Sequence, residues 1–434
     1  MVARAASGSA SSKPIVIVIS LDGLPAQALR DPKLPMPTLR ALAASGAVAD
    51  AMRPINPTVT WPNHTTLITG VDASHHHVMA NGLITFPTDG SEPEIKPWVA
   101  KDELVHARTL YEAAKEKGLT TAQVDWVAIY GAKGVDWEFG ENPDPDGAIA
   151  QELAAGGEVT REQIASFAED SNPAWRDQIW TDAAIDILRN HTPNLLLLHL
   201  LDTDTIQHGS APYSNPAYVA YAYADACVKR VVDAARAMGI LDRTTFFIVS
   251  DHGFAPFTQV IEPNAALAQQ GLLHNEGSHR VGSVWAVAEG GAAEMFIRDE
   301  TLRAKLVPQL KTYFSAMPGI AHVYTNAEAR AIGLPAEADS DQAPQLYLTA
   351  APGYAFGENT DGPVAHLLHE PEGQHGALNT MPEMQALFVA SGAAIRPGTH
   401  LNAILNLQVA PTIAAILGLQ LPEAQEPALE KILR

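Results

Sequence analysis

The stretch "PIVIVIS" at residues 14–20, which runs into Leu21-Asp22-Gly23, decides the fold class. A short apolar run rich in β-branched residues and ended by a turn signal predicts a buried strand. Three further runs have this character, and helical patterns lie between them. The strand runs are "NLLLLHLL" at 194–201, "TTFFIVS" at 244–250 and "MQALFVASG" at 384–392, and the helical patterns cover 36–46, 102–118 and 217–239. Strands that alternate with helices predict an α/β fold, with a largely parallel sheet covered by helices on both faces.

Polar residues follow three of these four runs directly. Asp22 follows the first run, the stretch 202–208 follows the second, and Asp251-His252 follow the third. His375, in "GQHG", stands shortly before the fourth run. Because ligands of open α/β sheets bind at the carboxyl ends of the strands, we expect these side chains to lie close together.

The residue types at this edge are those of a metal site. Carboxylate oxygens and imidazole nitrogens are suitable zinc ligands, and two zinc ions about 4 Å apart can clamp the attacking and leaving oxygens of a phosphoryl transfer. Singly, each residue has a simpler explanation, since "DG" and "DHG" are common turns and an Asp-x-x-x-His spacing arises by chance. Together they predict two Zn²⁺ ions. The candidate ligands are Asp22, Thr60, Asp204, His208, Asp251, His252 and His375.

Thr60 lies in "NPTVTWPNHTTLITG" at 56–70, at the start of a predicted helix. Pro62 is tolerated there because its missing N–H would be unpaired in the first helical turn. Free N–H groups and the helix dipole favour negative charge at this position. A threonine in such a place is commonly an N-cap, and the alternative is a nucleophile beside the predicted metal site.

Composition limits the partners of the chain. Its 434 residues are 47% hydrophobic and 18% charged, which is typical of a globular protein. The net charge of −21, without a cluster of Lys or Arg, argues against a stable nucleic-acid partner. No apolar run reaches the roughly 18 to 20 residues that a membrane-spanning helix needs, so we expect no membrane span. The oligomeric state stays open.

The single cysteine, Cys227, excludes an intrachain disulfide and a thiolate zinc site. Its context "CVKR" lacks the Cys-x-Pro-x-Arg pattern of formylglycine sulfatases, and the surrounding helical pattern predicts a buried helix position. The first 14 residues contain no hydrophobic segment, so no signal peptide is visible and the localisation is left open.

The domain organisation is predicted to be one catalytic domain over 1–434 with two additions. The segment 82–175 shows no clear periodicity and is a candidate cap. The segment 255–370, with its Pro, Gly and Ala-rich connections, is a candidate insertion subdomain with its own short strands and helices.

Five motifs, in order and spread over nearly the whole chain, resemble one family. They are "VISLDG", "TWPNHTTLITG", "DTDTIQHG", "SDHGF" and "GQHG". Their combination is similar to the nucleotide pyrophosphatase/phosphodiesterase family of the alkaline phosphatase superfamily. The resemblance implies an alkaline phosphatase-like sandwich and zinc-dependent hydrolysis of phosphodiester or nucleotide pyrophosphate bonds through a phosphorylated or nucleotidylated threonine. It further implies a small-molecule phosphodiester or nucleotide substrate and a periplasmic or extracellular location.

The resemblance also implies roles for individual residues. Asn81, in "HHHVMANG", matches an asparagine that donates to a non-bridging phosphoryl oxygen. Trp61 stands where relatives carry an aromatic residue, usually phenylalanine, that can stack on a nucleobase or aryl leaving group; ordinary packing is the alternative. Asp202 competes with Asp204, and the spacing of four to His208 favours Asp204. The implied metal sets are Asp204, His208 and His375 for one zinc, and Asp22, Asp251, His252 and the Thr60 oxygen for the other.

Phosphate monoesters and phosphodiesters differ in negative charge, and this difference helps to choose between them as substrates. Monoesterases of this superfamily meet the extra negative charge of a monoester with added cationic side chains or a third metal. Lys133, in "YGAKG", is the one candidate in a suitable loop, so a phosphodiester is favoured. Lys133 keeps two alternatives open, a phosphate monoesterase and a phosphonoacetate hydrolase. An alternative of another class is a catalytically inactive zinc or carbohydrate binding module, against which the complete ligand set argues.

Overall fold

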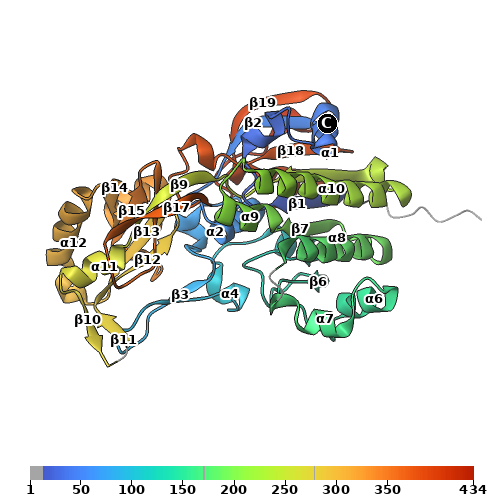
Figure 1. Cartoon of the computed structure of the whole chain (residues 1–434). Coiled ribbons are helices and arrows are strands. Elements are labelled where there is room, and N and C mark those ends of the chain that lie inside the picture. Colours follow the sequence, from blue (N-terminus) through green and yellow to red (C-terminus); the bar gives the residue numbers. More distant parts are fainter. Residues whose placement is uncertain (1–12, 170–171, 278) are drawn as a thin grey trace, which may run out of the picture.

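The computed structural model describes residues 13–169, 172–277 and 279–434. The first 12 residues, which hold most of the N-terminal stretch without a hydrophobic segment, lie outside the described residues. A large central sheet carries helices on both faces, and a smaller part with its own sheet lies at the left of the view in Figure 1. The predicted α/β fold is therefore confirmed. Within the described residues, no helix combines the length and the apolar character needed to cross a membrane.

The central sheet has eight strands in the order β19-β2-β18-β8-β1-β7-β5-β6. Neighbouring strands are parallel except at β18, which runs against both β2 and β8. The strands are β1 Ile15–Leu21, β2 Ala47–Arg53, β5 Thr121–Val124, β6 Trp137–Phe139, β7 Leu195–Leu200, β8 Thr244–Val249, β18 Phe388–Gly392 and β19 Thr399–Leu405. The four predicted runs are all present. The fourth begins later than predicted, because residues 382–384 form a 3-10 turn ahead of β18.

Alternate side chains of β1 enter two different cores, which explains why its apolar run is continuous. Ile15, Ile17 and Ile19 pack in one core, whereas Val16 and Val18 pack in the other. The first core is covered by α1 Pro37–Ser45, α8 Pro173–Asn190 and α10 Asn215–Ala237, and the second by α2 Thr60–Thr69, α5 Leu110–Glu116 and α14 Val409–Leu417. Cys227 is buried in α10, as predicted.

The prediction of one helix over 102–118 is wrong. The structure has a short α4, Lys101–Leu104, and a separate α5. Thr109 ends the connection between them, because its side chain accepts from the backbone N–H of Glu112 while the Glu112 side chain accepts from the Thr109 N–H. This reciprocal capping starts a new helix inside the apolar pattern.

The segment 82–175 contributes to the central body as well as to its surroundings. It supplies β5 and β6 to the central sheet and α5 to the second core. The helices α6 Ala148–Gly156 and α7 Arg161–Ala165 pack in the first core. A cap can therefore include only β3 Leu83–Thr85, β4 Glu94–Lys96 and α4.

The segment 255–370 and the residues just after it build three small sheets, of which the smallest is the pair β10 Leu273–Glu276 and β11 His279–Gly282. The three-stranded sheet consists of β9 Ala255–Ile261, β16 Gly353–Phe356 and β17 Ala365–Gln374. The four-stranded sheet, called here the insertion sheet, consists of β12 Val284–Glu289, β13 Ala292–Ile297, β15 Leu346–Ala350 and β14 Ile320–Thr325. With α11 Pro263–Gln269 and α12 Glu300–Ser315 it encloses a separate hydrophobic core. The segment has its own strands and helices, and its status as a subdomain stays a prediction.

Candidate active site

Three adjacent parallel strands bring the predicted site together at one edge of the central sheet. Asp22 follows β1, Asp251 follows β8, and α9 (Asp202–Ser210) starts two residues after β7 ends. The backbone N–H of Gly23 donates to Asp251 Oδ1 at 3.1 Å, which joins the ends of β1 and β8. The polar residues that follow these strands therefore lie close together, as their parallel order predicts.

The first group of side chains is Asp22, Asp251 and His252. Their ligand atoms lie within 4.8 Å of one another, and all three side chains are fully buried. His252 Nε2 is 3.1 Å from Asp251 Oδ2 and 3.5 Å from Asp22 Oδ1. Neither of these two carboxylate oxygens has a hydrogen-bond partner among the described residues. Buried carboxylates with unpaired oxygens require a positive partner, so this group fits a cation.

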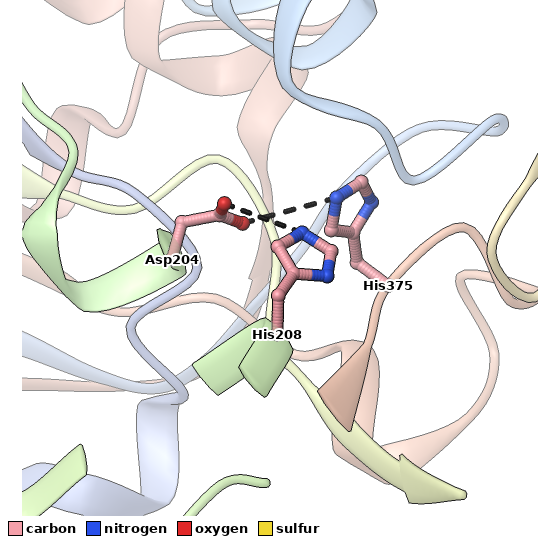
Figure 2. A group of neighbouring side chains, drawn as sticks. All are labelled: Asp204, His208 and His375. Atoms are coloured by element: carbon pink, nitrogen blue, oxygen red, sulfur yellow. Dashed lines mark ion pairs between the residues drawn. The ribbon is translucent and has the colours of Figure 1, made fainter. Parts of the chain in front are cut away.

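The second group is Asp204, His208 and His375, whose ligand atoms also lie within 4.8 Å of one another. Asp204 Oδ2 lies 3.3 Å from His208 Nε2, and Asp204 Oδ1 lies 3.8 Å from His375 Nε2. Figure 2 marks both ion pairs with dashed lines. The spacing of four places Asp204 and His208 on one face of α9. The structure therefore brings Asp204, and not its competitor Asp202, into the group.

His375 reaches this group from an unexpected direction. The sequence suggested a position beside the fourth strand of the central sheet, but His375 directly follows β17 of the three-stranded sheet. Its ring stacks on that of His252 with centroids 4.1 Å apart. The second group is therefore assembled from two sheets, and the stacked rings bring the two groups into contact.

The histidine tautomers suit metal binding. His252 Nδ1 lies 3.1 Å from Gly253 O, and His375 Nδ1 lies 3.1 Å from Thr58 O. Since a carbonyl oxygen only accepts, both Nδ1 atoms carry the hydrogen and both Nε2 atoms present a lone pair. Burial, together with the neighbouring His252, lowers the pKa of His375 to about 3, so this ring is neutral near pH 7.

Electrostatics also indicate that the acidic residues need a cation. Burial, reinforced by the charges of Asp251 and Asp204, raises the pKa of Asp22 well above its usual value. Burial also acts to raise the pKa of Asp204, but the neighbouring imidazoles of His208, His375 and His252 together outweigh it and hold that pKa below the usual value. A positive charge held between these carboxylates would favour their ionised forms.

Thr60 is the first residue of α2 and not its cap. Val59 occupies the N-cap position, and no side chain caps this helix. Thr60 is only 7% exposed, and its hydroxyl oxygen lies 3.4 Å from His252 Nε2. The N-cap alternative for Thr60 therefore fails, because the hydroxyl is directed to the first metal-type group.

A cavity of about 310 Å³ joins Thr60 to both groups. Trp61 and Asn81 line it, and the Trp61 N–H donates to Asn81 Oδ1 at 3.0 Å. This bond occupies the oxygen of the Asn81 amide and leaves its NH₂ group to serve as a donor. Pro97, Trp98 and Val127 line the same cavity, so residues from the segment 82–175 bound the space beside Thr60. A second cavity of about 670 Å³ continues past Trp61 and Trp98.

Trp61 lies in the wall of the cavity, whereas Lys133 lies at the surface. Trp61 packs against Val78, Leu104 and Val127 and at the same time lines both cavities, so packing and stacking are compatible for it. Lys133 has an 88% exposed side chain and pairs with Asp102 at 3.2 Å. Among the described residues that line the smaller cavity there is no Lys or Arg.

Sequence analysis missed a buried layer behind the first group. His199, in β7, places Nε2 2.9 Å from Asp22 Oδ2 and Nδ1 3.0 Å from Asp125 Oδ2. His64, in α2, places Nδ1 3.5 Å from Asp251 Oδ2 and 2.9 Å from the Thr60 carbonyl oxygen. Such outer partners orient metal ligands. The signal available in the sequence was a single histidine inside the apolar run "NLLLLHLL".

The whole chain is similar in fold to solved structures of one group of enzymes. Mouse ectonucleotide pyrophosphatase/phosphodiesterase 5, an inactive variant in complex with AMP, superposes with a TM-score of 0.73 at 17% identity, covering 97% of this chain and all of that one. The human counterpart gives a TM-score of 0.71. This likeness shows an alkaline phosphatase-like α/β fold, which carries the two candidate metal-binding groups.

Residues 16–378 match the family of type I phosphodiesterases/nucleotide pyrophosphatases, and the chain belongs to this family. Curated relatives agree. A fission yeast pyrophosphatase/phosphodiesterase is 23% identical over 93% of this chain and 77% of its own length. Human ectonucleotide pyrophosphatase/phosphodiesterase family member 1 is 22% identical over 94% of this chain, which spans only 40% of that protein. A Xenopus laevis bis(5'-adenosyl)-triphosphatase is 22% identical over 94% of this chain and 79% of its own length.

Proposed function

We propose that this protein hydrolyses phosphodiester or nucleotide pyrophosphate bonds with Thr60 as the nucleophile and two zinc ions as cofactors. The observation that carries the proposal is the position of the Thr60 hydroxyl. It caps no helix N–H, lies 3.4 Å from His252 Nε2, and shares one cavity with both groups of candidate ligands.

Both groups fit zinc by their chemistry. Each combines carboxylate oxygens with imidazole nitrogen, the ligand types that zinc accepts, and each contains a buried carboxylate oxygen without a partner among the described residues. Asp22, Asp251 and His252 would hold one ion together with the Thr60 oxygen, and Asp204, His208 and His375 the other. When bound, zinc ions favour the alkoxide of a coordinated hydroxyl and stabilise the attacking and leaving oxygens.

The protein's own residues account for the steps at phosphorus. Thr60 Oγ1 forms a bond to phosphorus while the bond to the leaving oxygen breaks, which gives a phosphorylated or nucleotidylated Thr60. The Asn81 NH₂ group donates to a non-bridging oxygen where negative charge accumulates. Water then attacks the same phosphorus atom, releases the phosphoryl product and restores the hydroxyl of Thr60.

The charge of the cavity supports a diester in preference to a monoester. A monoester brings an additional negative charge, and no Lys or Arg is found among the described residues that line the cavity beside Thr60. Lys133, which kept the phosphate monoesterase and phosphonoacetate hydrolase alternatives open, is exposed and paired with Asp102. Nucleotide substrates are supported by the AMP bound to the mouse structure of the same fold, and Trp61 offers a flat surface for a base.

A direct test compares bis-p-nitrophenyl phosphate with p-nitrophenyl phosphate as substrates of the full chain. We expect faster turnover of the diester, loss of activity on treatment with a chelator, and recovery on addition of zinc. Metal analysis of the active protein should give two equivalents of zinc. Faster monoester turnover would favour the phosphate monoesterase, and no turnover of either compound by zinc-loaded protein would favour a catalytically inactive binding module.

A further inference from the structure

A group of buried oxygen atoms lies on the insertion sheet and belongs to neither candidate metal group. Six side-chain oxygens there have no hydrogen-bond partner among the described residues. They are Glu289 Oε1, Glu294 Oε1, Glu294 Oε2, Tyr347 Oη, Thr349 Oγ1 and Gln374 Oε1. Buried polar atoms are normally paired, so a group of unpaired atoms requires an explanation.

Strand register places four of the five side chains on one face of the insertion sheet. Ala292 is opposite Glu289 on one side and opposite Thr349 on the other. Glu294, two residues along β13, is opposite Tyr347. Residues opposite one another, and residues two apart in a strand, share a face. The four oxygen-bearing side chains therefore lie on one face of the sheet, on the strands around Ala292.

Gln374 adds an oxygen from the neighbouring sheet. A Cβ atom on Gly290 would lie 3.3 Å from Gln374 Oε1, so this amide oxygen is beside the turn that follows Glu289. The Gln374 side-chain nitrogen donates to Tyr354 O at 2.8 Å. That hydrogen bond fixes the orientation of the amide and turns its oxygen away from Tyr354.

The two carboxyl groups have no positive partner. Glu294 is fully buried, and neither glutamate forms an ion pair within the part of the chain that the structure describes. Burial, together with the charge of Glu358, raises the pKa of Glu289 to about 8. Burial, together with the charge of Glu289, raises the pKa of Glu294. Carboxyl groups in such surroundings are either protonated or matched by a bound cation.

We propose that this oxygen cluster binds one divalent cation of the calcium type. Calcium takes six to eight oxygen ligands from carboxylates, amide or backbone carbonyls and neutral oxygens in variable geometry, which is the chemistry of the set present here. The cluster offers no imidazole or thiolate that would favour zinc. Glu289 is only partly buried and the neighbouring Glu358 is exposed, so the site has an acidic entrance from solvent.

A cation at this place would join the insertion sheet to the parts that carry the active site. The same face of the sheet packs, through Ala292 and Tyr347, against Met79 and Ala80, which directly precede Asn81. The turn after Glu289 contacts the loop that carries His375, since the Gly291 N–H donates to the His375 carbonyl oxygen at 2.7 Å. The expected role is therefore structural, and it is independent of the proposed catalytic chemistry.

The test uses the full chain, saturated with zinc, in buffer freed of calcium. Calcium chloride is titrated while heat release and the unfolding temperature are measured. We expect one equivalent of calcium to bind and to raise the unfolding temperature, because a ligand that binds only the folded state stabilises it. Glu294→Gln keeps the side-chain size but removes the charge, and it should weaken calcium binding by roughly tenfold or more.

Two further variants make the result specific. Thr349→Val removes one neutral oxygen at nearly constant volume and should also weaken calcium binding, which covers the case that Glu294→Gln fails to fold. Glu300→Gln, an exposed position on α12, should bind calcium like the wild type. The proposal is overturned if the wild type binds no calcium at millimolar concentration, or if Glu294→Gln and Thr349→Val bind it as tightly as the wild type. It is also overturned if Glu294→Gln raises the unfolding temperature and the wild type ignores calcium, since the carboxyl groups are then held protonated.

Discussion

The two candidate metal groups use the same ligand types but differ in their access to solvent. The side chains of Asp22, Asp251 and His252 are fully buried. In the other group Asp204 and His375 are nearly buried, whereas the side chain of His208 is 47% exposed. The buried group lies beside Thr60, which must be held in one geometry for attack. In the proposed mechanism the open group would stabilise the leaving oxygen and receive the attacking water, so the difference in exposure would match the division of chemical roles.

The strongest test of this division is Thr60→Ala. The proposal predicts that kcat falls by about 10⁴-fold or more, a loss typical of an enzyme nucleophile. Stability should stay close to that of the wild type, because the Thr60 hydroxyl caps no N–H group. Turnover of bis-p-nitrophenyl phosphate and thermal unfolding measure the two quantities. Thr65→Ala is a matched control on the same helix, since Thr65 donates to the Trp61 carbonyl, and it should remain active.

Graded chelation tests the difference in access directly. Zinc should leave in two phases, the first from the exposed group with His208 and the second from the buried group. Loss of the first ion should reduce turnover by roughly 10²-fold or more, since a metal stabilises transition-state charge by several kcal/mol. Zinc content and activity are measured on the same samples. His208→Ala should lack the fast phase and keep the slow one; a single phase in the wild type would contradict the comparison.

His199→Gln addresses the layer behind the buried group. His199 bridges Asp22 and Asp125, and loss of an outer partner typically costs 10- to 100-fold in metal affinity or activity. We expect such a loss of zinc affinity, with activity partly restored by excess zinc. His191→Gln is the control, since His191 pairs with Glu152 outside the site. An activity loss that excess zinc does not change would argue against a positioning role for His199.

Trp61→Ala tests the leaving-group side of the cavity. Stacking of a base on an aromatic side chain is worth about 1 to 3 kcal/mol, so KM for nucleotide or nitrophenyl diesters should rise roughly 5- to 150-fold. KM for methyl diesters should change much less. Trp61→Phe, which keeps an aromatic face, should recover most of the effect. An equal rise in KM for the aromatic and the methyl diesters would show that Trp61 contributes only packing and no stacking.

The smallest expected effect belongs to Lys133→Ala. The side chain is 88% exposed and its ion pair with Asp102 is at the surface, where such pairs contribute little to stability. Diester and monoester turnover should both stay within about twofold of the wild type. A selective loss of monoester turnover would show that Lys133 reaches the substrate and would revive the phosphate monoesterase alternative.

The sequence predicts well what depends on neighbouring residues. The runs that became β1, β7 and β8 have continuous apolar character because both faces of these strands are buried. The polar residues after them could be assigned to one edge since parallel strands end together. For the same reason the sequence alone predicts that Asp22, Asp204 and Asp251 lie near one another.

Features that depend on distant segments could not be predicted. The direction of β18 is set by its partners β2 and β8 and not by its own residues. His375 follows a strand of a separate sheet, and nothing in "GQHG" indicates to which sheet that strand belongs. The pairing of His199 with Asp125 joins residues 74 positions apart, and the unpaired oxygens around Ala292 follow from strand register.

Gly376 links the position of the candidate ligand His375 to the folding of the insertion sheet. Its φ of +87° is unfavourable for other residues, and a Cβ atom there would lie 1.7 Å from Glu289 O, in the turn of the insertion sheet. The loop with His375 therefore fits only against a completed β12–β13 turn. A nascent chain whose insertion sheet has not formed would lack one of its candidate zinc ligands. If the proposed function holds, recovery of turnover during refolding would report assembly of the periphery and not of the central sheet alone.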